Sequence, residues 1–318
     1  MNNQQPQADG RIEEVWRDLS KTPPSLNPKW FYDAQGSRLF DEITRQPEYY
    51  LTACELNIIT AQGAEIGRWI GPGAALVELG AGNGEKAVLL LHALQKPAAY
   101  VPVDISRASL ETAVHTVRKA MPQLRVEALC QDFGQGFSWP SHLSADCRCL
   151  AFLGSTIGNM EPFEAGRWLG HMANSLHPGD KMLIGVDLKK DPRVLNAAYN
   201  DANGVTADFN RNALAHLNRA LNTRFDVAGF LHRAYYNERA GCIEMHLQAI
   251  SDQMVEIGPY RLKIAAGEHI HTENSYKYTV EEFGQLARDA GFETDMVWCD
   301  QPRWFSLHGL RVTKRSRH

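Results

Sequence analysis

One short segment near the C-terminal end carries ligand-binding side chains at alternating positions. Residues 269–277 read HIHTENSYK. Side chains alternate between the two faces of a strand, so the row His271, Glu273, Ser275 and Lys277 is predicted to share one face. That face is too polar to pack against a hydrophobic core. We therefore expect it to meet a ligand.

A metal ion is an alternative ligand for the same segment. His269, His271 and Glu273 stand at every second position, and two imidazoles with a carboxylate suit iron or zinc. Short surface strands often carry such residues without a ligand. We predict no metal and keep the metal site as the minority hypothesis.

A glycine-rich turn follows the predicted strand 74–80 and opens a predicted helix at 85–95. Glycines let the backbone turn tightly and approach a ligand that a Cβ would obstruct. A dinucleotide-binding turn has the spacing G-x-G-x-x-G, but its last position here is Glu85, which would repel a pyrophosphate. The turn reads Glu78-Leu79-Gly80-Ala81-Gly82-Asn83-Gly84. With an acidic residue before the first glycine, it resembles instead the first motif of S-adenosylmethionine-dependent methyltransferases, whose cofactor carries a cationic sulfonium and no phosphate.

Acidic residues end the next two predicted strands. Asp104 lies about twenty residues beyond Gly84, where a carboxylate can accept both ribose hydroxyls of a nucleoside. Asp132 can meet an adenine amine while Phe133 packs on the ring. Each residue alone is common in loops, but three such features at successive strand ends favour S-adenosylmethionine, with NAD as the alternative.

Two further groups of residues lie where a pocket is expected. Asn159 leaves the predicted strand 148–154, at the edge where open α/β sheets bind ligands, although an Asx turn explains it equally well. Two adjacent tyrosines face different ways in most conformations, so at most one of Tyr49 and Tyr50 is expected to serve a pocket. The full aromatic group is Trp30, Phe31, Tyr32, Phe40, Tyr49 and Tyr50.

Short apolar strands alternate with amphipathic helices from about residue 75. This pattern predicts a doubly wound, Rossmann-like α/β sheet. The predicted strands are 74–80, 99–105, 125–133, 148–154, 181–188, 292–300 and 304–312, and the predicted helices are 85–95, 107–121 and 163–176.

The alternation is interrupted between residues 190 and 278. Residues 190–226 have helical spacing and 227–278 have strand alternation, until a capping box at Thr279 and Glu282 opens another helix. We therefore expect a second α+β lobe inserted into the sheet domain. The predicted sheet domain is 56–189 with 279–318, and the predicted substrate lobe is 11–55 with 190–278.

Composition excludes several classes of protein. The 318 residues are 44% hydrophobic and 22% charged, with a formal net charge of −4, which predicts no general affinity for nucleic acid or anionic membranes. The first residues do not resemble a signal peptide, and no apolar run has membrane-spanning length. The six cysteines are scattered, as in reduced cytoplasmic proteins. We expect a cytoplasmic monomer with small-molecule partners.

Seven segments match a known family of enzymes. They are WFYDAQGSRLFDEIT (30–44), PEYYLTACE (47–55), LVELGAGNGEK (76–86), FLGSTIGN (152–159), DPRVLNAAYNDANGVTADFNRN (191–212), IEM (243–245) and HTENSYK (271–277). Through them the chain resembles, from about Leu26 onward, the L-histidine Nα-methyltransferases of ergothioneine biosynthesis. The resemblance implies one lobe for S-adenosylmethionine and a second for the amino acid.

The resemblance also assigns roles to matching positions. Asn159 and Tyr199 match residues that hold the substrate carboxylate, Glu273 and Ser275 match the pair that binds the imidazole, and Met245 matches a residue packed near that ring. Tyr49 lines the amino-acid site and Tyr32 joins it through water. The implied cofactor contacts are Gly80, Lys86, Asp104, Asp132 and Phe133, to which the turn itself adds Glu78, Gly82 and Gly84.

The implied reaction is in-line displacement at a sulfonium methyl by the neutral α-amine of L-histidine. Burial beside the positive sulfonium lowers the pKa of that amine, so no general base is assigned. Three transfers would give the trimethylated betaine, hercynine. No segment resembles the iron-dependent sulfoxide synthase, so the chain is predicted to stop at methylation. The alternatives are methylation of another free amino acid and a binding protein without turnover.

Overall fold

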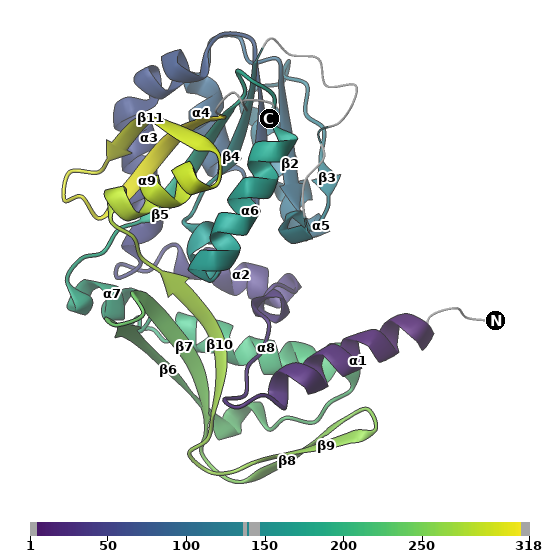
Figure 1. Cartoon of the computed structure of the whole chain (residues 1–318). Coiled ribbons are helices and arrows are strands. Elements are labelled where there is room, and N and C mark those ends of the chain that lie inside the picture. Colours follow the sequence, from purple (N-terminus) through teal and green to yellow (C-terminus); the bar gives the residue numbers. More distant parts are fainter. Residues whose placement is uncertain (1–4, 136–138, 140–146, 313–318) are drawn as a thin grey trace, which may run out of the picture. The chain divides into compact units, whose positions relative to one another are not determined.

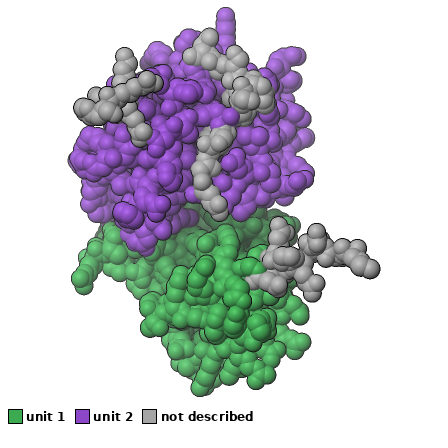
Figure 2. Space-filling view, turned by 45° about the vertical axis from the view of Figure 1, so that its right-hand side comes forward, with its two compact units in different colours: residues 1–49, 191–275 green, residues 50–190, 276–318 purple. Residues whose placement is uncertain are grey.

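Figure 1 shows the computed structural model of the chain, which describes residues 5–135, 139 and 147–312. Its internal contacts divide it into two compact units, coloured in Figure 2. Unit 1 is Met1–Tyr49 with Asp191–Ser275, and unit 2 is Tyr50–Lys190 with Tyr276–His318. The lobe boundaries predicted from the sequence, at 55/56, 189/190 and 278/279, differ from these divisions by six, one and three residues. The first of them falls inside a helix that begins at Tyr50.

Unit 2 is a seven-stranded sheet with helices on both faces (Figure 1). Strand β1 is buried at every position because its residues are continuously apolar apart from Glu78. The elements are α3 (Tyr50–Ile70), β1 (Ala74–Leu79), α4 (Glu85–Ala93), β2 (Ala99–Asp104), α5 (Arg107–Ala120), β3 (Leu129–Cys130), η2 (Phe133–Gln135), β4 (Cys147–Phe152), η3 (Thr156–Asn159), α6 (Pro162–Ser175), β5 (Lys181–Asp187), α9 (Val280–Asp289), β11 (Phe292–Cys299) and β12 (Phe305–Val312).

The order of the strands in this sheet is β11-β12-β5-β4-β1-β2-β3. The five strands from β3 to β5 run parallel, as the strand–helix alternation predicts, whereas β12 pairs antiparallel with both β5 and β11. The carboxyl ends of β1, β2 and β3 therefore lie side by side at one edge of the sheet. The sheet is Rossmann-like, mixed and mostly parallel.

Strand β3 is much shorter than the predicted strand 125–133. The backbone of Tyr100 on β2 donates to the Arg125 carbonyl at 2.8 Å and accepts from Glu127 at 3.0 Å, but the ladder resumes only at Leu129. The next residue of β2 whose N–H would face β3 is Pro102, which has no N–H to donate. Pro102 thus explains the gap.

Unit 1 combines a three-stranded sheet of order β10-β7-β6 with helices and a separate β8–β9 hairpin. Gly241 and Gly258 turn the two hairpins at positive φ. The elements are α1 (Gln5–Leu19), η1 (Pro28–Phe31), α2 (Ala34–Ile43), α7 (Pro192–Ala198), α8 (Val205–Leu221), η4 (Val227–Gly229), β6 (Phe230–Asn237), β7 (Cys242–Ala249), β8 (Gln253–Ile257), β9 (Tyr260–Ile264) and β10 (His269–Tyr276), whose last residue belongs to unit 2.

Strand β10 does not alternate regularly, which corrects the prediction of one polar row. The His271 ring bonds the Asn274 side chain at 2.8 Å, although residues three apart lie on opposite faces of a regular strand. Two adjacent residues, Thr272 and Glu273, are both buried. The alternation of side chains between the two faces of β10 therefore shifts near Thr272. Lys277 does not extend this row, because it lies beyond β10 and is fully buried in unit 2.

Three sequence expectations can be compared with the described residues. None of the helices in the described ranges has the length and apolar character needed to cross a membrane. All six cysteines are free thiols. The capping box at Thr279 and Glu282 is present at the start of α9, as predicted.

Candidate functional site

The glycine-rich turn between β1 and α4 exposes backbone at the carboxyl edge of the sheet. Gly80, Gly82 and Gly84 all have positive φ, a conformation that side-chain-bearing residues rarely adopt. Gly84 is buried, and a Cβ there would lie 2.9 Å from the Ala113 Cα on α5, whereas Gly80 and Gly82 are exposed. The turn therefore presents bare backbone to a ligand at two of its three glycines.

The structure brings the other predicted cofactor residues to this turn. The Gly82 N–H donates to the Asp104 carboxylate at 3.4 Å, and Ser106 N–H donates to the other Asp104 oxygen at 2.9 Å. A Cβ at Gly80 would lie 3.8 Å from the Phe133 ring. Burial raises the pKa of Asp104 above its ordinary value. Asp132 is exposed beside Phe133, with its carboxylate accepting from Gly134 N–H at 2.9 Å.

Glu78 lies beneath the turn rather than on its exposed side. It is 2% exposed, and its carboxylate accepts a hydrogen bond from the Tyr100 hydroxyl at 2.6 Å. Burial raises the pKa of Glu78 to about 7. Its side chain is thus shielded from solvent and bonded to the neighbouring strand β2.

Lys86 is held by a buried acid that the sequence reasoning did not select. Its ammonium lies 2.8 Å from the Glu55 carboxylate, which also accepts the Gly154 N–H at 2.9 Å. Glu55 is fully buried on α3. The sequence holds a signal for it, because Glu55 interrupts the apolar face formed by Leu51, Ile58 and Ile59.

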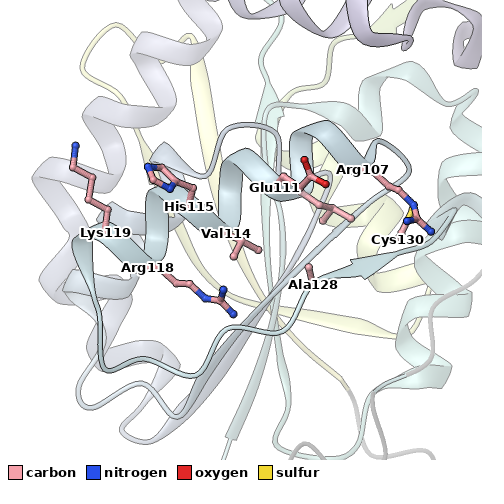
Figure 3. A pocket seen from close by; sticks show the side chains of 9 residues that line it. Arg107, Glu111, Val114, His115, Arg118, Lys119, Ala128 and Cys130 are labelled. Atoms are coloured by element: carbon pink, nitrogen blue, oxygen red, sulfur yellow. The ribbon is translucent and has the colours of Figure 1, made fainter.

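A separate cavity of about 670 Å³ lies over α5 and the β3 edge (Figure 3). No residue of the predicted site lines it. Its lining residues are Arg107, Leu110, Glu111, Val114, His115, Arg118, Lys119, Ala128 and Cys130.

The predicted amino-acid residues of unit 1 are linked by a run of aromatic contacts. The ring centroids are 6.2 Å apart for Tyr32 and Phe40, 6.3 Å for Phe40 and Tyr49, and 6.4 Å for Tyr49 and Tyr199. Phe209 of α8 lies 5.8 Å from Tyr32. Phe40 and Phe209 were not among the predicted site residues. The run joins two stretches that are distant in sequence, 32–49 and 199–209.

A hydrogen bond connects this aromatic run to β10. The Tyr199 hydroxyl donates to Ser275 Oγ at 2.7 Å, and both side chains are buried. Glu273, on the same strand, is 7% exposed. Met245 of the neighbouring β7 is 2% exposed, and its carbonyl accepts from the Thr272 hydroxyl at 3.0 Å. Six of the seven predicted substrate residues thus belong to unit 1.

The seventh, Asn159, ends η3 in unit 2. The connection before it is tightly held, because Ser155 adopts positive φ and its hydroxyl accepts the Asp187 N–H at 2.9 Å. A Cβ at Gly158 would lie 2.8 Å from the Tyr276 carbonyl. The adjacent residues Tyr49 and Tyr50 make different contacts. The Tyr49 ring contacts Tyr199, whereas the Tyr50 hydroxyl donates to Asp187 at 2.8 Å.

The metal hypothesis finds no supporting arrangement. Among the residues that the structure describes, no three His, Cys, Asp or Glu side chains are grouped to hold a metal ion. His269 and His271 contact His246 through their rings, at 5.7 and 5.1 Å, while the shift in the alternation of β10 separates them from Glu273.

The fold and the turn define the class, which is that of the S-adenosylmethionine-dependent methyltransferases. Residues 11–312 match the family model described as histidine-specific methyltransferase, SAM-dependent. The chain belongs to this family, and S-adenosylmethionine is its methyl donor.

Three comparisons illustrate the relationship. A histidine N-alpha-methyltransferase from Mycolicibacterium smegmatis is 40% identical over 94% of this chain and 95% of its own length. Ergothioneine biosynthesis protein 1 from Neurospora crassa is 33% identical over 93% of this chain, which matches 34% of that protein. A solved structure of a possible exported protein from Bordetella parapertussis has a TM-score of 0.50 at 13% identity, covering 95% of this chain and 79% of that one, a likeness of fold alone.

Proposed function

We propose that the protein transfers three methyl groups from S-adenosylmethionine to the α-amine of free L-histidine, giving hercynine for ergothioneine-type biosynthesis. Membership of the histidine-specific family supports the substrate and the donor. The observation that carries the proposal is the buried polar group on β10, in which Ser275 is bonded to Tyr199 at 2.7 Å. Such a group, joined through Tyr199 to the aromatic run, suits a small ligand with a polar ring.

The exposed glycine turn fits the proposed cofactor. S-adenosylmethionine supplies an electrophilic methyl group on a cationic sulfonium. Gly80 and Gly82 would admit its close approach, Asp104 would accept its ribose hydroxyls, and Asp132 with Phe133 would meet the adenine. Lys86, held by Glu55, is proposed to meet the cofactor carboxylate. Glu78, shielded from solvent, and Gly84, packed on α5, would support this site from within.

The proposed substrate residues divide into two groups. Asn159 and Tyr199 would hold the carboxylate, with Tyr49 lining the site and Tyr32 acting through water. Glu273 and Ser275 would bind the imidazole, and Met245 would pack near it. The bond between Tyr199 and Ser275 joins the two groups, so the carboxylate and the ring would be read by a connected set of side chains.

The proposed chemistry depends on alignment. Residues that bind both ends of histidine fix the direction of the amine lone pair, and such positioning lowers the barrier to displacement. We assign no general base, because burial near a positive charge favours the neutral amine. Glu273 provides selectivity, since an amino acid without a ring N–H would leave a buried carboxylate without its partner.

A cytoplasmic monomer completes the proposal. The free thiols of all six cysteines favour a reducing compartment such as the cytoplasm.

The test is incubation with S-adenosylmethionine and each amino acid separately, followed by mass spectrometry. Histidine should gain one, two and then three methyl groups, and the other amino acids should stay unmodified. Methylation of another amino acid in place of histidine would refute the specificity, and no methylation of any would refute the activity.

A further inference from the structure

A single buried carboxylate in unit 2 gathers three polar side chains around it. Asp187, the last residue of β5, is fully buried. Its oxygens accept the Tyr50 hydroxyl at 2.9 and 2.8 Å, the Lys190 ammonium at 2.5 Å and the Lys277 ammonium at 2.7 Å. Lys190 also donates to the Tyr50 hydroxyl at 2.7 Å. We call these four residues the Asp187 cluster.

Each partner of Asp187 stands where the chain passes between the two units. The chain passes three times, at Tyr49/Tyr50, at Lys190/Asp191 and at Ser275/Tyr276. Tyr50 and Lys190 are the unit 2 residues at the first two passages, and Lys277 is one residue beyond the third. The backbone reinforces this arrangement, because Tyr278 N–H donates to the Asp187 carbonyl at 3.2 Å. All three passages are thus anchored at one carboxylate.

The proposed substrate residues lie close along the chain to these anchors. Tyr49 directly precedes Tyr50, and Ser275 stands two residues before Lys277. Tyr199 follows Lys190 through the short helix α7. Asn159 is tied to the same place from within unit 2, through the bond from Asp187 N–H to Ser155 Oγ. Each segment that carries one of these proposed substrate residues therefore also holds a residue bonded to Asp187.

Burying this cluster is costly, which argues for a role beyond packing. The Lys277 and Asp187 side chains are completely shielded, and Lys190 is 4% exposed. Removing such charges from water carries a penalty that apolar side chains of similar volume would avoid. A carboxylate that accepts from three directions fixes its partners in direction, which apolar contacts do not.

We propose that Asp187 is a positioning residue for the amino-acid substrate, which fixes the three chain passages and through them Tyr49, Tyr199 and Ser275. This inference rests on the proposed function, because it uses the substrate residues assigned there. Asp187 touches neither reactant in this account. Its loss should weaken histidine binding and leave the cofactor site, formed at the ends of β1, β2 and β3, nearly unchanged.

The test measures KM for histidine and the Kd of S-adenosylhomocysteine in three variants. Asp187→Asn keeps the shape but leaves two ammoniums without their counter-charge, and we expect KM to rise about 30-fold while Kd changes by less than about threefold. Lys277→Met should act in the same direction. Tyr50→Phe removes one hydrogen bond and keeps the ring against Trp304, so a rise of roughly fivefold is expected.

A matched control exists at the opposite end of β5. Asp180 is a buried carboxylate that pairs with Arg148 at 2.6 Å, immediately before the first residue of β5. Asp180→Asn should lower the unfolding temperature without changing KM for histidine. A rise in KM equal to that of Asp187→Asn would show that any buried charge loss has this effect, and would overturn the inference.

Other outcomes are equally decisive. KM within about twofold of wild type in folded Asp187→Asn, or parallel losses of cofactor and histidine affinity, would overturn the inference. If Asp187→Asn does not fold, Tyr50→Phe takes its place: a KM within about twofold of wild type, or parallel losses of cofactor and histidine affinity, would overturn the inference. Turnover of the wild-type protein distinguishes this inference from the proposed function. If the wild type methylates no amino acid, the proposed function is refuted. Direct titration of histidine into the wild type and the variants then still tests the role of Asp187.

Discussion

The two units present their candidate half-sites in different chemical form. In unit 2 the proposed cofactor residues are mainly a glycine turn and acids at the ends of adjacent strands, so main-chain geometry places them. In unit 1 the proposed substrate residues come from the ends of η1 and α7, from the residue before α3 and from strands β7 and β10. Ring contacts and one hydroxyl link the tyrosines among them to Ser275. A backbone-built site suits a cofactor shared by many enzymes, whereas a side-chain-built site suits a particular acceptor.

The largest expected effect concerns the side-chain half-site. Glu273→Ala should lower kcat/KM for histidine by about 1,000-fold, roughly 4 kcal/mol, because it removes a buried carboxylate proposed to bond the ring N–H. Steady-state kinetics at saturating S-adenosylmethionine would measure it.

The control for this prediction is Glu244→Ala on β7. Glu244 bonds Tyr235 at 2.8 Å and Asn237 at 2.6 Å and has no role in the proposed site. Its loss should leave kcat/KM nearly unchanged. A loss in Glu273→Ala no larger than in this control would remove Glu273 from the proposed binding site.

The next effect concerns the support beneath the cofactor turn. Burial raises the pKa of Glu78 from 4.5 to about 7, so its contribution to the free energy of unfolding is fully present below pH 4.5 and is lost as pH rises through 7. The loss amounts to about 3 kcal/mol. Glu78→Gln does not titrate, so relative to wild type it should gain that amount between pH 4.5 and pH ~8. Denaturant unfolding of both proteins across this range would measure the difference, and parallel stability curves would contradict it.

A smaller effect separates two glycines of the same turn. Gly84→Ala should lower the free energy of unfolding by about 2 kcal/mol, because Gly84 has positive φ and its Cβ would clash with α5. Gly82→Ala carries the strain of positive φ but has nothing within 4 Å, so about 1 kcal/mol is expected. Thermal unfolding of the two variants compares them, and a reversed order would refute the packing explanation.

The smallest of the expected effects on histidine kinetics in the two half-sites concerns the bond between the two substrate groups. Tyr199→Phe keeps the ring beside Tyr49 but removes the hydroxyl that donates to Ser275, so KM for histidine should rise about tenfold. Kinetics with histidine would measure this rise. An unchanged KM would show that the hydroxyl supports packing alone.

The same contrast explains how far the sequence could predict the structure. The strand–turn–helix at residues 74–93 depends on local periodicity and on glycines, and it was predicted closely. The shortening of β3 depends on which N–H groups of β2 face it. The effect of Pro102, which has no N–H, could therefore be recognised only once the strand register was known. The break in β10 near Thr272 was missed, because periodic reasoning assumes a regular strand. Phe209 joined the aromatic run unpredicted, since contacts between distant segments leave no local pattern.

We expect the proposed cofactor residues of unit 2 and the proposed histidine residues of unit 1 to bind their ligands separately. A pair of calorimetric titrations is the most direct test. Asp104→Asn in unit 2 and Glu273→Gln in unit 1 each replace one carboxylate by an amide of the same shape. Each variant is titrated with S-adenosylhomocysteine, and then with histidine at saturating S-adenosylhomocysteine. We predict that Asp104→Asn weakens only the binding of S-adenosylhomocysteine and Glu273→Gln only the binding of histidine, each by about tenfold or more. Equal losses of both ligands in either variant would contradict it.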